Sequence, residues 1–431
     1  MHIKSRNIFH AFYFLMLLIC TSCGVQRISV STLQGESPCS SDSLFARYLQ
    51  KTSTPITQKN EVVLLKSGQE KFNHLFRDIE KAGHFIHLEY FNFRNDSIAR
   101  ELFMRLADKT SQGIKVRTLF DAFGNMSNNQ PLRKKHLDSL RQKGIEIETF
   151  DPIKFPYVNH VWSRDHQKIA VIDGIVGYTG GMNVADYYIK GLPEIGEWRD
   201  MHIRIKGPAV EKLQEAFLYS WNKETKQHLN EKDFFPYTNN NSDTLKTNGK
   251  AQIAIVQRVP KKAPASIRHA YIAAIDAAQH KIQIINPYFT PTISIRKAIR
   301  RAIRRGVRVE IMIPGKSDIP FTPDAALYIA NKLRKKGAHV YIYNGGFHHS
   351  KVMMVDERFC TVGSANLNSR SLRYDYEINA FILDLPVTAE LNEIFAADKQ
   401  NSTILTKDEY KNRSVWKRFV GWFAHLFTPV L

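Results

Sequence analysis

The stretch His166-Gln-Lys168-Ile-Ala-Val-Ile-Asp173 is repeated later in the chain as His349-Ser-Lys351-Val-Met-Met-Val-Asp356. In both copies a small pair and an asparagine follow the aspartate at the same spacing, as Gly180-Gly-Met-Asn183 and Gly363-Ser364-Ala-Asn366. The four apolar residues between lysine and aspartate predict a β-strand, and the glycines mark the end of a second short strand. Identical spacing from histidine to asparagine in both copies indicates a duplicated functional element.

The side chains of each copy divide between the two faces of its strand. Because side chains alternate, the histidine and the lysine point the same way, roughly 7 Å apart. Asp173 and Asp356 have the opposite parity, so we expect them to brace the strands rather than to touch the same ligand. The candidate catalytic set taken from the two copies is His166, Lys168, Asp173, His349, Lys351 and Asp356.

Length and charge limit the classes of function. The chain has 431 residues, of which 43% are hydrophobic, and this suits about two to three domains with proper cores. Lysine and arginine number 61 against 41 aspartates and glutamates, which gives a net charge of +20. Such a chain attracts polyanions, either nucleic acid or the anionic surface of a membrane, and charge alone does not choose between them.

The first 23 residues are typical of a targeting segment. Lys4 and Arg6 precede an apolar run from residue 8 to residue 20, which is short for a bilayer span. The segment resembles a bacterial lipoprotein signal, in which Cys23 would be lipidated; a short uncleaved anchor is the alternative. After cleavage before Cys23 only Cys23, Cys39 and Cys360 would remain, and these contain no Cys-x-x-Cys pair, so neither structural zinc nor redox chemistry is indicated.

Helical and strand patterns alternate along both halves, which predicts an α/β sandwich in each. In the first half they predict helices at 69–82, 96–109, 132–143 and 208–223, and strands at 85–93, 114–120 and 145–150. The second half repeats them, so the pattern indicates gene duplication. We expect a signal at 1–23, a tether at 24–59, a first domain at 60–226, a linker at 227–250, a second domain at 251–410 and an amphipathic tail at 411–431.

Two stretches bear on the partner. Residues 293–305 place six basic side chains on one half of a helix, which is either a solvated helix packed by its apolar side or a face for anionic headgroups. Residues 414–431 combine two tryptophans and three phenylalanines with basic residues. That pattern favours an interfacial helix; a helix docked on the surface of the protein is the alternative.

The duplicated histidines permit covalent phosphoryl transfer. One imidazole attacks phosphorus while the other, protonated, donates to the leaving oxygen, and the roles then reverse for an acceptor alcohol or water. Lysines and asparagines from both copies, including Asn183 and Asn366, supply donors for the phosphate oxygens. Each half also offers a downstream carboxylate to orient a histidine, Asp200 and Glu377. The histidines lack zinc-ligand spacing, so we expect no metal and no cofactor.

Both copies match the duplicated motif of the phospholipase D superfamily, and the chain resembles bacterial cardiolipin synthases from about Val62 to its C-terminus. Shared landmarks include Trp198-Arg-Asp-Met-His202, Asn286-Pro-Tyr-Phe289 and Gly363-Ser-Ala-Asn-Leu-Asn-Ser-Arg370. The resemblance implies two fused α/β/α sandwich domains related by a pseudo-twofold, with one active site in the cleft between them. It also implies transfer of a phosphatidyl group between two phosphatidylglycerol molecules, which releases glycerol.

The same resemblance assigns roles within the site. It makes His166 the nucleophile and His349 the acid and base, and it places Asn183, Asn366 and Ser364 around the substrate, with Ser364 and His348 toward the back. The expected partners are an anionic phospholipid and the surface of a bacterial cell membrane, without nucleic acid.

Three alternatives to this function remain open from the sequence. They are a phospholipase D hydrolase, a nuclease, and a lipid-binding protein without catalysis. The acceptor is also open: phosphatidylglycerol, phosphatidylethanolamine, glycerol and water all fit.

Overall fold

The computed structural model describes residues 39–153, 162–239 and 247–428. Cys23 and the rest of the predicted signal lie outside the described residues. Within those ranges no helix is both long enough and apolar enough to cross a bilayer.

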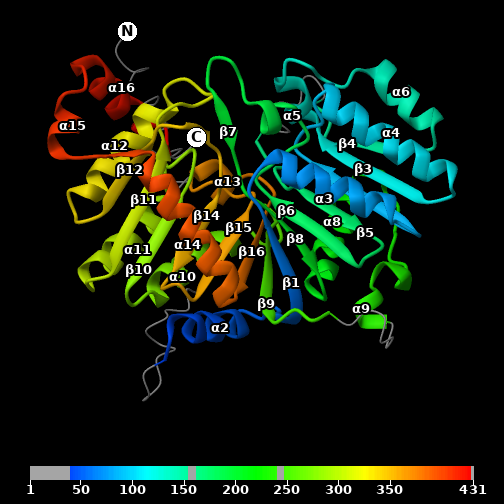
Figure 1. The fold of residues 1–431 in the computed structure, drawn as a ribbon, viewed down its shortest axis with the longest axis horizontal. Helices are drawn as coiled ribbons and strands as arrows, with labels where there is room; N and C mark the ends of the chain where they lie inside the picture. Colours follow the sequence, from blue (N-terminus) through cyan, green and yellow to red (C-terminus); the bar gives the residue numbers. More distant parts are fainter. Residues whose placement is uncertain (1–38, 154–161, 240–246, 429–431) are drawn as a thin grey trace, which may run out of the picture.

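The first half is an α/β unit with helices on both faces of its sheet (Figure 1). Ile86 and Leu88 face a core closed by α3, α4 and α6, whereas Ile169 and Val171 face a second core closed by α8. The predicted helices and strands are found within a few residues of their expected bounds. The elements are β1 (Thr57–Leu65), α3 (Gly68–Glu80), β2 (Phe85–Tyr90), α4 (Ser97–Ser111), β3 (Lys115–Asp121), α5 (Ala122–Ser127), α6 (Lys134–Gln142), β4 (Glu146–Phe150), β5 (Ile169–Ile172), β6 (Val176–Gly180), α7 (Tyr187–Lys190), β7 (Glu197–Arg199), β8 (His202–Lys206) and α8 (Ala209–Thr225).

The second half follows a short connection, η3 (Lys232–Phe234) and α9 (Pro236–Asn239), which packs Phe234 into the first half. This connection falls in the stretch predicted as a linker. The elements of the second half are β9 (Ala251–Arg258), α10 (Ser266–Ala277), β10 (Lys281–Ile285), α11 (Ile293–Arg304), β11 (Arg308–Pro314), α12 (Thr322–Arg334), β12 (His339–Tyr343), β13 (Gly346–His348), β14 (Val352–Val355), β15 (Phe359–Gly363), α13 (Ser369–Arg373), β16 (Glu377–Leu383), α14 (Leu385–Gln400), β17 (Ser402–Ile404), α15 (Lys407–Lys411) and α16 (Val415–Leu426).

The strand order displays the duplication directly. One continuous sheet runs β17-β12-β11-β10-β14-β15-β16-β9-β1-β8-β6-β5-β2-β3-β4, and β1 and β9 pair at its centre. Outward from that pair, β8-β6-β5-β2-β3-β4 on one side match β16-β15-β14-β10-β11-β12 on the other. The predicted fold of two related α/β/α halves is therefore confirmed.

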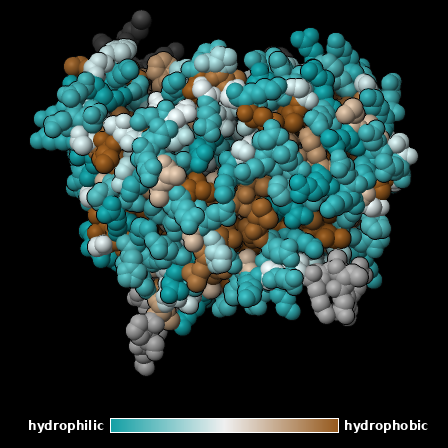
Figure 2. Space-filling model, viewed as in Figure 1, coloured by the Kyte–Doolittle hydropathy of each residue, from teal (hydrophilic) through white to brown (hydrophobic). Residues whose placement is uncertain are grey.

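The face shown in Figure 2 is mostly hydrophilic, with hydrophobic side chains gathered along its middle. They lie over β1, between α3 of the first half and α14 of the second (Figures 1 and 2). The halves thus meet along a partly apolar line, and one buried core contains residues from both.

The prediction of a tether over residues 24–59 is wrong from Ser41 onward. Helix α2 (Ser41–Lys51) buries Leu44, Phe45, Tyr48 and Leu49 in the core of the second half, and the Phe45 ring stacks on Phe359 at 4.9 Å. The helix was not predicted because its apolar face has only four residues and the surrounding sequence is rich in serine and threonine. Because Phe359 pairs with Val355, α2 docks at the end of β14 that is far from Lys351.

The basic face predicted at residues 293–305 is partly used inside the protein. Arg301 Nη2 lies 2.6 Å from Asp276 Oδ2, and Arg305 Nη2 donates to three carbonyl oxygens at 3.1 Å, those of Ile275, Asp276 and Ala278. These interactions tie α11 to the end of α10 and favour the packed-helix alternative over a headgroup-binding face.

Candidate active site

The backbone beside each histidine pairs with the opposite half of the chain. The N–H of His166 donates to the Tyr376 carbonyl at 3.0 Å, and the N–H of His349 donates to the Arg199 carbonyl at 2.6 Å. Beside His349 the pairing continues as a two-stranded parallel sheet of β7 and β13. In each case the next residue of the opposite half is one of the two candidate carboxylates.

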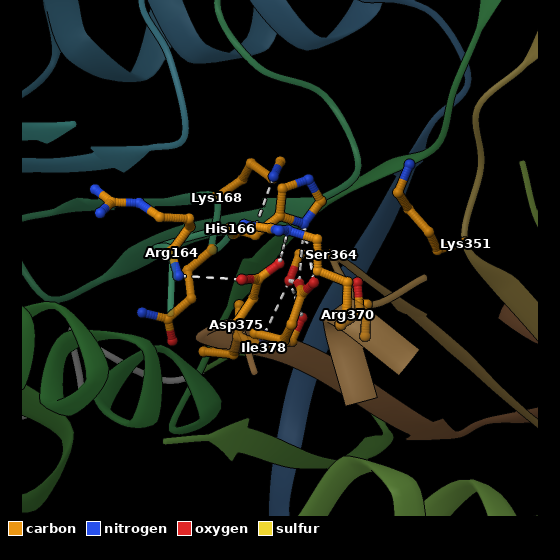
Figure 3. A network of polar contacts seen from close by, with 12 residues as sticks. Arg164, His166, Lys168, Lys351, Ser364, Arg370, Asp375 and Ile378 are labelled. Atoms are coloured by element: carbon orange, nitrogen blue, oxygen red, sulfur yellow. Dashed lines mark hydrogen bonds and ion pairs between the residues drawn. The ribbon is translucent and has the colours of Figure 1, made fainter. Parts of the chain in front are cut away.

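Each histidine is therefore hydrogen-bonded to a carboxylate from the other half. His166 Nδ1 lies 3.0 Å from Glu377 Oε1, and His349 Nδ1 lies 2.7 Å from Asp200 Oδ2. Figure 3 shows His166 beside Lys168 and Ser364 in this network. A carboxylate at Nδ1 accepts the Nδ1–H and leaves the Nε2 lone pair available. The sequence supplies both carboxylates, but only the fold shows that the pairs cross between the halves.

Both carboxylates are fully buried and remain ionised. Burial by itself raises the pKa of Glu377, but His166 and Lys168 together outweigh it, so that this pKa is lowered. Burial opposes the lowering of the pKa of Asp200 in the same way, and Lys351 with His349 outweighs it. At neutral pH both groups are thus hydrogen-bond acceptors only, as an orienting group for imidazole must be.

The two imidazoles are neutral near pH 7. Burial lowers the pKa of His166 to about 4, against the opposing effect of Glu377. Burial and the charge of Lys351 also lower the pKa of His349. A neutral imidazole with a free Nε2 is the form that attacks phosphorus.

The lysines place two amino groups against the same histidines. Lys168 Nζ donates to the His166 carbonyl at 2.6 Å, and Lys351 Nζ donates to the His349 carbonyl. Burial lowers the pKa of Lys168 to about 7 and that of Lys351 to about 8, and each carries part of its charge at neutral pH. Each lysine lies one residue before its strand, Lys168 before β5 and Lys351 before β14. The strands therefore begin one residue after the lysine and do not include the histidine and lysine.

Asp173 and Asp356, predicted with the catalytic set, bind backbone N–H groups. Asp173 accepts the backbone N–H groups of Gly83, His84 and Phe85 at 2.7 to 2.8 Å, and Asp356 accepts those of Gln279, His280 and Lys281 at the same distances. Five residue steps along each strand place the aspartate roughly 16 Å beyond its lysine. The two aspartates hold the starts of β2 and β10, as their parity predicts.

Ser364, predicted around the substrate and toward the back of the site, is hydrogen-bonded within the protein. Its hydroxyl donates to Glu377 Oε2 and accepts the N–H of Ile378 at 2.9 Å. Asn183 and Asn366 are buried, and within the described residues the Oδ1 of each has no hydrogen-bond partner. An amide Oδ1 accepts a hydrogen bond, so these oxygens suit a hydroxyl of a ligand rather than a phosphate oxygen, and donation from the two side-chain NH₂ groups to phosphate remains a prediction.

Several side chains of the site are not distinguished by the sequence pattern. Lys71 is fully buried on α3 and donates to the Met182 and Asn183 carbonyls at 3.2 and 2.9 Å, which holds the turn that carries Asn183. Arg164 Nη2 lies 2.9 Å from Asp121 Oδ2, and Asp121 also accepts the N–H of Asp165 beside the first histidine. Neither residue has a periodicity that sets it apart from its neighbours.

Aromatic rings wall the side of His349. The ring centroids of Phe347, Trp198, Tyr288 and Tyr188 lie 5.3, 5.5, 6.0 and 6.4 Å from its imidazole. His166 has the Phe91 ring at 5.2 Å. His348, predicted at the back of the site, lies 3.0 Å from Asp398 through Nε2 and is completely buried.

The arrangement has the parts of a phosphoryl-transfer site. It combines two neutral imidazoles, each backed by an ionised carboxylate, with two amino groups and two amides. In the part of the chain that the structure describes, no group of three or more histidine, cysteine, aspartate or glutamate side chains could hold a metal ion.

A family model described as "Cardiolipin synthase, PLD-like domain" matches residues 75–221 and 271–399. A cardiolipin synthase of Staphylococcus aureus is 38% identical over 379 residues, which are 87% of this chain and 74% of that protein. The major cardiolipin synthase of Bacillus subtilis is 37% identical over 376 residues, with 87% of this chain and 76% of that protein covered.

Solved structures agree on the fold. A phosphatidylserine synthase from Haemophilus influenzae has a TM-score of 0.67 at 15% identity, with 90% of this chain and 100% of that chain covered. A polyphosphate kinase from Porphyromonas gingivalis has a TM-score of 0.50 at 11% identity, with 78% of this chain and 49% of that chain covered.

The duplicated halves and the paired histidine–lysine motifs define a phospholipase D-type enzyme, so the predicted superfamily is confirmed. Within it, the chain belongs to the cardiolipin synthase, PLD-like domain family.

Proposed function

We propose that this chain transfers a phosphatidyl group from one phosphatidylglycerol to another, which yields cardiolipin and glycerol. The observation that carries this proposal is the crossed pairing of His166 with Glu377 and of His349 with Asp200, at 3.0 and 2.7 Å. It brings two oriented imidazoles to one site, as a double-displacement reaction requires. The names of the Staphylococcus aureus and Bacillus subtilis relatives support the choice of product.

In the first half-reaction Nε2 of His166 attacks the phosphorus of the donor lipid. The bond from phosphorus to the headgroup glycerol breaks, and Nε2–H of His349 protonates the departing oxygen. The negative charge of the donor phosphate opposes the effect of Lys351 on the pKa of His349, and so favours the protonated imidazole that this step needs. Lys168, Lys351 and the two asparagines face the phosphate oxygens as charge accumulates on them.

In the second half-reaction a hydroxyl of the second phosphatidylglycerol loses its proton to His349. Its oxygen attacks the phosphohistidine, and the bond between phosphorus and Nε2 of His166 breaks. Water is the competing acceptor. The aromatic rings around His349, at 5.3 to 6.4 Å, limit the room for free water and favour an alcohol delivered by a lipid.

Thin-layer chromatography after incubation with labelled phosphatidylglycerol tests the reaction. We expect equal amounts of cardiolipin and glycerol; phosphatidic acid in place of cardiolipin would reassign the chain as a hydrolase. His166→Ala and His349→Ala should each abolish both products, while His280→Ala, which removes an exposed histidine, should retain them. Activity should persist in excess EDTA, and its complete loss there would indicate a required metal.

The proposal also places the chain at the bacterial cell membrane. The division into a first domain at 60–226 and a second at 251–410, the tail at 411–431, and anchoring through an acylated Cys23 belong to the same proposal. The phospholipid substrate supports this location, because an enzyme acting on bilayer lipids must reach their headgroups.

A further inference from the structure

Exposed apolar side chains gather at the end of the molecule where the histidines lie. In the second half Phe321, 64% exposed, and Ile319, 46% exposed, occupy the loop between β11 and α12. In the first half Met126 on α5 is 66% exposed, and Trp162, four positions before the first histidine, is 53% exposed. All four sit in connections at the ends of the strands that lead into the site.

The loop that carries Phe321 is connected to the site by direct contacts. Asp318 accepts a hydrogen bond from the Tyr288 hydroxyl at 2.7 Å, and the Tyr288 ring lies 6.0 Å from the imidazole of His349. The apolar loop therefore begins one residue after Asp318, which is hydrogen-bonded to an aromatic side chain beside His349.

Helix α16 adds a large apolar row beside that loop. A Cβ at Gly421 would lie 2.5 Å from the Asp324 carbonyl oxygen, and the rings of His425 and Tyr328 lie 4.5 Å apart, so α16 packs closely on α12. This contact agrees with the docked-helix alternative for the tail. The face of α16 that packs on α12 is the narrow one around Gly421. The opposite face keeps five aromatic side chains exposed: Trp416, Phe419, Trp422, Phe423 and Phe427.

The exposed row is larger than a scattered surface hydrophobe and is paired with positive charge. Aromatic side chains of about 150–250 Å² each, roughly half exposed, present on the order of 500 Å² of apolar surface. The helix itself has Lys417 and Arg418 and no acidic residue, and Lys316 is exposed beside the Phe321 loop. An anionic lipid surface complements both the aromatic row and these charges.

We propose one membrane-docking rim, formed by α16, the Ile319–Phe321 loop, Met126 and Trp162. This rim holds the side of the protein that carries the two histidines against an anionic bilayer. In Figure 1 α16, the start of α12, α13 and α5 lie along the upper part of the molecule, and α2 lies at the opposite end. The rim spans both halves, because Trp162 lies 6.2 Å from Tyr374 of the second half, ring to ring. The donor and acceptor lipids then enter from the same leaflet. This extends the proposed function by assigning how its substrates arrive.

Fluorescence quenching by brominated phosphatidylglycerol vesicles tests the rim in the full chain. Of the five tryptophans, Trp198 and Trp221 are buried, so the Trp416→Phe/Trp422→Phe variant leaves Trp162 as the exposed reporter. We expect brominated vesicles to reduce emission from this double variant relative to unbrominated ones, and we expect the loss to disappear when Trp162→Phe is added. No quenching in the double variant would overturn a rim that includes the first half.

A second measurement compares vesicles with short-chain, monomeric phosphatidylglycerol. We expect Phe321→Ser to lower the initial rate on vesicles about tenfold and to leave the rate on monomeric substrate unchanged. Leu385→Ser, a matched control 56% exposed on α14, should change neither rate. Equal losses of rate on vesicles and on monomeric substrate would show that Phe321 does not act through membrane docking. A concentration-dependent dimer in light scattering, without quenching by vesicles, would assign the surface to contact between copies of the chain. Quenching needs no turnover, so it is informative even if the proposed reaction is wrong.

Discussion

The crossed carboxylates predict that two conservative substitutions act on different half-reactions. Glu377→Gln should slow formation of the phosphohistidine, because Glu377 orients the proposed nucleophile His166 at 3.0 Å. Asp200→Asn should not change the rate of phosphohistidine formation when the leaving group of the substrate needs no acid. It should instead slow the breakdown of the phosphohistidine, in which His349 acts as the base. A hydrogen bond to a charged partner contributes about 1.5–3 kcal/mol, and loss of the correct imidazole tautomer costs up to about 5.5 kcal/mol. The affected step should therefore slow by roughly 10- to 10⁴-fold.

Stopped-flow release of p-nitrophenolate from phosphatidyl-p-nitrophenol separates the two steps. The wild-type chain should give a burst of one equivalent; Glu377→Gln should reduce the burst rate, and Asp200→Asn should reduce only the steady phase. Glu357→Gln is the matched control, since Glu357 pairs with Lys281 at the surface. If Asp200→Asn slows the burst and Glu377→Gln does not, then His349 is the nucleophile.

Three further outcomes follow from the same geometry. Asp173→Asn should lower the free energy of unfolding in urea by about 2–4 kcal/mol while the folded enzyme keeps its kcat, because the carboxylate holds three backbone N–H groups; lost activity at unchanged stability would place it in the site. The kcat/KM should fall above about pH 7 to 8 as Lys168, with a pKa of about 7, and Lys351, with a pKa of about 8, lose their protons and cease to attract phosphate; a rise through this range would contradict their role. Mass analysis of the mature protein should find an acyl group on Cys23 and none in Cys23→Ala, and an unprocessed Met1 terminus would contradict the lipoprotein prediction.

Much of this molecule follows from local pattern. The four apolar residues between Lys168 and Asp173 form the predicted short strand, and Asp96 before an apolar-periodic run caps α4 by accepting from the Ala99 N–H. The duplication is visible because both halves repeat the same strand and helix order. The bracing role of Asp173 follows from side-chain alternation alone.

The parts that local pattern does not reveal depend on contacts between distant segments. Asp200 and Glu377 are recognisable as orienting carboxylates, but their exchange between halves depends on the backbone pairing of His166 with Tyr376 and of His349 with Arg199. Lys71 occupies a helix among apolar neighbours, where a lysine ordinarily lies at the surface, and only the packed structure shows the two carbonyl groups that it binds. Helix α2 is concealed in the same way, because its short apolar face is stable only against the core of the second half.

The small departures from symmetry bear on which histidine attacks. Behind His166, Glu377 is held on its other oxygen by the Ser364 hydroxyl, whereas the matching residue of the first half is Gly181. A side chain at Gly181 would collide with the carboxylate of Asp200, so that half has no hydroxyl in this position. Both orienting carboxylates are fixed on their other oxygen, Glu377 by the Ser364 hydroxyl and Asp200 by the N–H of Met201 at 2.7 Å. The ammonium of Lys351 lies 3.0 Å from Nε2 of His349, whereas Lys168 donates to the His166 carbonyl. A free Nε2 suits an imidazole that attacks phosphorus, and an ammonium beside Nε2 suits an imidazole that gives up and regains a proton there. The asymmetry therefore supports His166 as the nucleophile on physical grounds that are independent of the family resemblance.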